Sequence, residues 1–176
     1  MTIQAVFIDR DGTLGGTGRF IHPRDFRLFP STMEALELLK AHSIQAIALT
    51  NQHNIAKGLA TEAEFHEEFE SYGFDAVYIC PHEPEEGCEC HKPRPGMLLK
   101  AAAEHQLDLT QCVVIGDVGS TDMLAAAAVG ARKIIVQTGW GKSSLDLYRD
   151  KWYEQATPEY VAEDLLDAVN WLLKPK

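Results

Sequence analysis

The chain has 176 residues, of which 45% are hydrophobic, enough to bury roughly 70% of the unfolded surface in one core, so we expect a single domain over residues 1–176. The formal net charge of −10 opposes polyanions and argues against nucleic acid or anionic membranes as partners. The sequence shows neither an export leader nor an apolar stretch of the roughly 20 residues that cross a bilayer, which predicts a cytoplasmic protein and, without a long apolar stripe, a monomer.

Short apolar runs along the chain predict buried strands. Each run is continuous rather than alternating, as expected for strands that are covered on both faces. The runs are AVFID (5–9), AIALT (46–50), AVYIC (76–80), CVVIG (112–116) and KIIVQ (133–137).

Helical patterns separate these runs and predict helices over residues 31–42, 61–72, 95–106 and 121–131. Ser31 with Glu34 and Thr61 with Glu64 have the spacing of a capping box. The tail 160–173 predicts a short strand and a helix capped by Asp164. Strand and helix alternate, which predicts an α/β fold of three layers with a central parallel sheet.

Polar residues follow the strands where they end, and ligands of such sheets bind at that edge. Asp9 and Asp11 follow the first strand, Thr50 ends the second, and Asp117 follows the fourth. Carboxylates gathered at one edge repel one another unless a cation lies among them. Because the ligands are hard oxygens, we expect Mg²⁺.

These residues resemble the haloacid dehalogenase (HAD) superfamily of phosphohydrolases, whose four motifs occur here in family order. The corresponding segments are DRDGT (9–13), Thr50 in ALTN, Lys92 in HKPRPG and GDVGSTD (116–122). The resemblance implies a Rossmann-like, HAD-like domain with phosphatase activity.

By this resemblance Asp9 is the nucleophile, and Asp11 is the general acid and then the general base. Mg²⁺ is held by Asp9 and Asp117 and by the backbone carbonyl of Asp11. Asp122 orients Lys92 or the waters of the metal. The expected substrate-binding residues are Arg10, Thr50, Asn51, Gln52, His53, His91 and Lys92.

Three of the four cysteines lie close together, and with a histidine they form the pattern C-x-H-x5-C-x-C. Without an export leader, such a cluster indicates a metal rather than disulfides. Cys80, His82, Cys88 and Cys90 suit tetrahedral Zn²⁺, and four protein ligands leave no open position, so this zinc is structural. We expect it to order the loop that ends just before Lys92.

The same pattern resembles the capless branch of the family, subfamily IIIA, which includes heptose bisphosphate and histidinol-phosphate phosphatases. The chain has no room for a cap domain, so loops 14–24, 51–60 and 81–94 are expected to select the substrate. It departs from the heptose branch at His53, Asn54, His91 and Val118. An arginine and a lysine are expected at the last two positions, and having fewer fixed cations favours a single phosphate.

The sequence therefore predicts a Mg²⁺-dependent phosphomonoesterase (EC 3.1.3 type) acting on a small phosphorylated metabolite of the sugar phosphate or heptose bisphosphate type. Histidinol phosphate is the alternative substrate. From other classes, a phospho-accepting receiver has its acceptor on the third strand and lacks a zinc loop. A silent binding scaffold is opposed by the presence of both Asp9 and Asp11.

Overall fold

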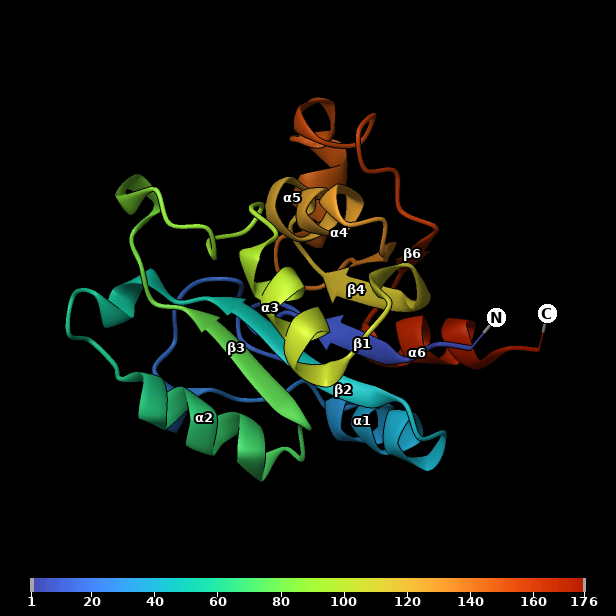
Figure 1. Cartoon of the computed structure of the whole chain (residues 1–176), viewed down its shortest axis with the longest axis horizontal. Helices are drawn as coiled ribbons and strands as arrows, with labels where there is room; N and C mark the ends of the chain where they lie inside the picture. Colours follow the sequence, from blue (N-terminus) through green and yellow to red (C-terminus); the bar gives the residue numbers. More distant parts are fainter. Residues whose placement is uncertain (1, 176) are drawn as a thin grey trace.

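The computed structural model describes residues 2–175. Its centre is a sheet with strand order β3-β2-β1-β4-β5-β6, and all pairs are parallel (Figure 1). The strands are β1 (Ala5–Ile8), β2 (Gln45–Asn51), β3 (Ala76–Cys80), β4 (Cys112–Gly116), β5 (Arg132–Val136) and β6 (Tyr160–Ala162). The chain reverses its direction of travel across the sheet between β1 and β4, where crevices in doubly wound sheets form.

Helices cover both faces of the sheet, which confirms the predicted three-layer α/β fold (Figure 1). They are α1 (Thr32–Ala41), α2 (Glu62–Ser71), α3 (Gly96–His105), α4 (Leu124–Ala128), α5 (Gly141–Asp146) and α6 (Leu165–Leu173). Leu39 of α1, Phe65 of α2 and Leu172 of α6 pack in one core with Ile8. On the opposite face, Leu98 of α3 packs in a second core.

The two predicted capping boxes have different outcomes. Thr61 is the N-cap of α2, where its hydroxyl accepts from the Glu64 amide at 3.2 Å and the Glu64 carboxylate accepts from the Thr61 amide at 2.9 Å. The capping box predicted at Ser31 is wrong, because the Ser31 side chain makes no capping hydrogen bond to α1. The Ser31 hydroxyl instead donates to Asp164 at 3.0 Å, so it links α1 to the start of α6. Asp164 caps α6, as expected, by accepting from the Asp167 amide at 2.8 Å.

The segment after β4 differs most from the prediction. Residues Gly119–Met123 form one π-helical turn, and α4 is shorter than the helix expected over 121–131. Helix α5 is not predicted by the sequence, because glycines on both sides of Trp140 disfavour a helix. These elements position Asp117, Asp122 and Trp140 at the carboxyl edge of the sheet.

The sheet carries no cap domain in the part of the chain that the structure describes. Between β1 and α1 the chain forms turns, two isolated β-bridges at Gly15 and a 3-10 turn at Pro23–Asp25. Between β2 and β3 it forms a 3-10 turn and α2. The expected capless architecture is thus confirmed. Across residues 2–175, no helix is long and apolar enough to span a membrane.

Candidate active site

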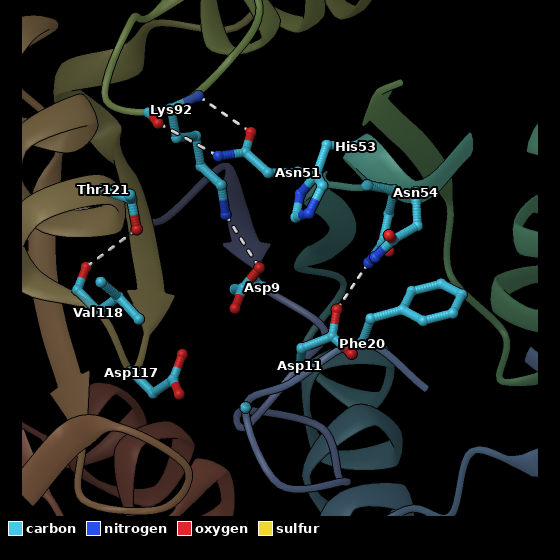
Figure 2. A pocket seen from close by; sticks show the side chains of 12 residues that line it. Asp9, Asp11, Phe20, Asn51, His53, Asn54, Lys92, Asp117, Val118 and Thr121 are labelled. Atoms are coloured by element: carbon cyan, nitrogen blue, oxygen red, sulfur yellow. Dashed lines mark hydrogen bonds and ion pairs between the residues drawn. The ribbon is translucent and has the colours of Figure 1, made fainter. Parts of the chain in front are cut away.

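A cavity of about 150 Å³ opens at the carboxyl edge of the sheet (Figure 2). In the strand register, Ile8 pairs with Ala48 of β2 and Ile115 of β4, so the residues that follow these strands converge. The lining residues come from four segments of the chain. They are Asp9, Asp11, Gly18, Phe20, Asn51, Gln52, His53, Asn54, Lys92, Asp117, Val118 and Thr121.

Three carboxylates form a compact acidic cluster beside the cavity. Asp9, Asp117 and Asp122 each place an oxygen within 4.8 Å of the others. Asp117 Oδ1 is buried and has no hydrogen-bond partner among the described residues, while Oδ2 accepts from the Trp140 amide at 2.8 Å. Burial and the nearby charge of Asp9 raise the pKa of Asp117 well above its ordinary value. A free, inward carboxylate oxygen beside a second carboxylate fits Mg²⁺.

Lys92 is the cation of this site, and its ammonium group makes three contacts. Lys92 Nζ donates to Asp122 at 2.6 Å, to the carbonyl of Leu49 at 2.8 Å and to Asp9 at 2.9 Å. The Asn51 side chain pairs with the Lys92 backbone, accepting from its amide at 3.0 Å and donating to its carbonyl at 3.2 Å. Asn51 and Asp122 thus fix the lysine against Asp9. Figure 2 shows the contacts of Lys92 with Asn51 and Asp9.

Asp11 lies across the cavity from this cluster, and its carboxylate is held on both sides. Arg10 donates to Asp11 Oδ1 at 2.7 Å, and Gln52 donates to Oδ2 at 2.6 Å. Burial raises the pKa of Asp11 to about 6, although the charge of Arg10 acts in the opposite direction. A buried carboxyl group with such a pKa can hold a proton near neutral pH.

The structure divides the expected substrate-binding residues into two groups. Asn51, Gln52, His53 and Lys92 line the cavity, whereas Arg10, Thr50 and His91 do not.

Local contacts explain why Arg10, Thr50 and His91 do not line the cavity. Arg10 is fully buried and its donors are directed to Glu68, Asp11 and the Ile21 carbonyl. The hydroxyl of Thr50 is covered by Gln52, from which it accepts at 2.9 Å. His91 faces the cysteine cluster, with Nδ1 at 3.9 Å from Cys80 Sγ.

Five lining residues are not among the site residues expected from the sequence: Gly18, Phe20, Asn54, Val118 and Thr121. Phe20 and Asn54 lie in loops expected to select the substrate, and Val118 follows Asp117 directly. Thr121 lies inside the segment GDVGSTD, so its place in that motif was the available signal. Gly18 lies in the loop that was expected to select the substrate, but nothing local distinguishes it from the neighbouring glycines. The φ angle is 83° at Gly12 and 89° at Gly18, so both turns near the site use the left-handed region of backbone conformation, which favours glycine.

Cys80, His82, Cys88 and Cys90 come together, as expected, after β3. The Sγ atoms of Cys80 and Cys88 are 3.6 Å apart, those of Cys88 and Cys90 are 3.5 Å apart, and those of Cys80 and Cys90 are 2.9 Å apart. His82 Nδ1 is 3.1 Å from Cys90 Sγ. Zinc–sulfur bonds of about 2.3 Å in a tetrahedron separate the sulfurs by about 3.8 Å. The cluster is consistent with a zinc site.

Comparison with known proteins agrees with this geometry. Residues 89–168 match the Hydrolase_like family (HAD-hyrolase-like). The chain is 34% identical over 155 residues to D-glycero-beta-D-manno-heptose-1,7-bisphosphate 7-phosphatase of Yersinia pestis, covering 78% of this chain and 82% of that protein. It is 36% identical over 157 residues to the enzyme of the same name from Vibrio cholerae, covering 79% and 84%.

A solved structure is also similar over nearly the whole chain. The D,D-heptose 1,7-bisphosphate phosphatase from B. bronchiseptica, complexed with magnesium and phosphate, superimposes with a TM-score of 0.82 at 30% identity. The match covers 97% of this chain and 98% of that one. The magnesium is a property of that structure, and the acidic cluster described above is suited to the same ion.

Fold and site together define a capless phosphatase of the HAD type, which confirms the predicted class of enzyme. The chain belongs to the HAD-like hydrolase family that includes the D-glycero-D-manno-heptose-1,7-bisphosphate 7-phosphatases.

Proposed function

We propose that residues 1–176 form one cytoplasmic, monomeric phosphatase domain that hydrolyses a phosphorylated sugar of the heptose 1,7-bisphosphate type with the help of Mg²⁺. The observation that supports this best is the position of Asp9. Its carboxylate lies at the cavity between Lys92, at 2.9 Å, and Asp117, whose Oδ1 lacks a partner among the described residues. A carboxylate so placed is balanced by positive charge and remains accessible to a phosphate.

In the proposed reaction Asp9 attacks phosphorus, and the bond from phosphorus to the sugar oxygen breaks. Asp11, which is protonated at the start, gives its proton to the departing oxygen. Lys92 binds the phosphoryl oxygens as their charge increases, and the hydroxyl of Thr50 donates to them once Gln52 moves aside. Bound Mg²⁺ supplies positive charge that offsets the repulsion between carboxylate and phosphate.

The second half of the reaction returns the enzyme to its starting state. Asp11, now a carboxylate, removes a proton from water, which attacks the aspartyl-phosphate at phosphorus. Asp9 is released together with inorganic phosphate. We propose that zinc on Cys80, His82, Cys88 and Cys90 only orders the Lys92 loop, since four protein ligands complete its coordination.

The test is phosphate release measured with and without Mg²⁺, using heptose 1,7-bisphosphate, its 7-monophosphate, histidinol phosphate and acetyl phosphate. We expect turnover that depends on Mg²⁺, is abolished in Asp9→Asn, and is ranked by kcat/KM in favour of the heptose substrates. Asp117→Asn should raise the Mg²⁺ concentration for half-maximal activity. Turnover without a divalent ion, or an active Asp9→Asn variant, would overturn the proposal, and a preference for histidinol phosphate would select the alternative substrate.

A further inference from the structure

A second hollow lies beside the catalytic cavity, with a volume of about 420 Å³. We call it the Trp140 groove. It is lined by Gly18, Val118, Ser120, Thr121, Trp140, Ser144, Tyr148 and Lys151. Gly18, Val118 and Thr121 line both the groove and the catalytic cavity, so the two share a wall at the mouth of the site.

The size of the catalytic cavity suggests a use for the groove. Sites for small organic ligands usually measure about 300–1,000 Å³, whereas the catalytic cavity measures about 150 Å³. The catalytic cavity is large enough for the phosphoryl group under attack, but the rest of a sugar phosphate has to extend beyond it. The groove is the larger of the two spaces and adjoins the cavity directly.

Trp140 is held in place by the catalytic centre itself. Its backbone amide donates to Asp117 Oδ2 at 2.8 Å, and two residues earlier the Thr138 hydroxyl donates to the Gly12 carbonyl at 2.6 Å. Its indole packs against Gly18, where a methyl group would collide with the ring. The position of the ring is therefore coupled to a proposed metal ligand and to the loop over the cavity.

The groove is lined by two exposed aromatic rings and one cation, Lys151, and a second cation, Arg19, lies near Trp140. Trp140 is 38% exposed and Tyr148 is 46% exposed, although large apolar side chains are usually covered. The Arg19 guanidinium lies 5.9 Å from the Trp140 ring and Lys151 Nζ lies 5.2 Å from the Tyr148 ring. Neither cation forms an ion pair with a carboxylate of residues 2–175.

These properties match the two parts of a phosphorylated sugar. The C–H faces of a sugar pack against aromatic rings, and a phosphate pairs with an unpaired cation. Val118, which stands between the cavity and the groove, has no charge of its own. Lys151, by contrast, lines the groove but not the catalytic cavity, and it is positively charged.

We propose that the Trp140 groove binds the leaving-group half of a bisphosphorylated sugar, with the carbon skeleton on Trp140 and Tyr148 and the second phosphate on Lys151. The inference rests on the proposed phosphatase function, and it adds a specificity site that is separate from the residues of the phosphoryl transfer.

The experiment compares kcat/KM for acetyl phosphate, heptose 7-phosphate and heptose 1,7-bisphosphate in the full-length enzyme. Lys151→Met should lower the ratio of bisphosphate to 7-monophosphate about tenfold, because a charge-assisted contact is lost. Lys142→Met removes an exposed positive charge on α5 outside the groove and should leave the ratio unchanged. Trp140→Ala should lower the ratio of 7-monophosphate to acetyl phosphate about tenfold, and Trp140→Phe should restore most of it.

Each result decides a separate point. An equal loss on all three substrates in Trp140→Ala would show that the side chain only supports Asp117, and it would overturn the proposal. So would a Lys151→Met variant with the ratio of Lys142→Met, or a wild type that prefers the 7-monophosphate to the bisphosphate. A wild type that hydrolyses none of the three, acetyl phosphate included, would instead refute the proposed function.

Discussion

Arg10 and Glu68 form a bidentate ion pair that is buried beneath the active site. Arg10 Nε and Nη2 each donate to a Glu68 oxygen at 2.8 Å, and the guanidinium lies over the ring of Phe26, 3.9 Å from its centroid. The remaining nitrogen, Nη1, donates to Asp11 at 2.7 Å. Glu68 on α2 therefore fixes the arginine that orients the proposed general acid.

This arrangement predicts that the Arg10–Glu68 pair contributes to the free energy of unfolding and, separately, to activity through the orientation of Asp11. Glu68→Ala should lower the free energy of unfolding by about 3–5 kcal/mol, because it leaves the Arg10 charge buried without a partner. Glu67→Ala, at an exposed position of the same helix, should change it by less than about 0.5 kcal/mol. Urea denaturation measures both values.

A double variant separates the two effects. Arg10→Met with Glu68→Leu removes both charges, and it should recover most of the stability lost in Glu68→Ala. Its kcat/KM for a sugar phosphate should stay low, because Asp11 has lost the donor that orients it. If the activity recovered together with the stability, Arg10 would have no role in positioning Asp11.

The pKa of Asp11 predicts how the rate depends on pH. Burial raises this pKa to about 6, so the protonated form that serves as general acid is lost as the pH rises through that value. With a sugar phosphate, kcat/KM should then fall roughly tenfold per pH unit above about pH 6. With 4-nitrophenyl phosphate, whose leaving group departs without a proton, the fall should be much shallower.

Asp11→Asn is the matched variant for this prediction. In this variant the fall of kcat/KM with pH should be the same for the two substrates. The kcat for the sugar phosphate should decrease by a factor of roughly 10²–10⁴. The measurement is a pH–rate profile for each substrate at saturating Mg²⁺. Equal slopes for both substrates in the wild type would assign the pH dependence to another group.

Much of the fold follows from local patterns in the sequence. The continuous apolar runs predict the strands, and the residues that end them predict which carboxylates gather at one edge, as Asp9 and Asp117 do. The partners of these residues carry no such local signal. Glu68 is 58 residues from Arg10, and in the sequence it resembles the exposed acidic residues beside it on α2. Trp140 lies between two glycines, which argue against the helix α5 that begins there. Only the three-dimensional contacts identify them.

The cysteine cluster supports the last prediction, that the chain holds about one zinc and that this zinc positions Lys92. Elemental analysis of Cys88→Ser should show the zinc lost and the unfolding free energy lowered by about 3 kcal/mol, or roughly 6–12 °C in Tm. Cys112→Ala, which changes a buried cysteine of β4 away from the cluster, should keep the metal. Activity should fall in Cys88→Ser even below its Tm and at saturating Mg²⁺, because Lys92 follows Cys90 by two residues and depends on that loop. A zinc-free protein with wild-type stability would show that the four side chains hold the loop without a metal.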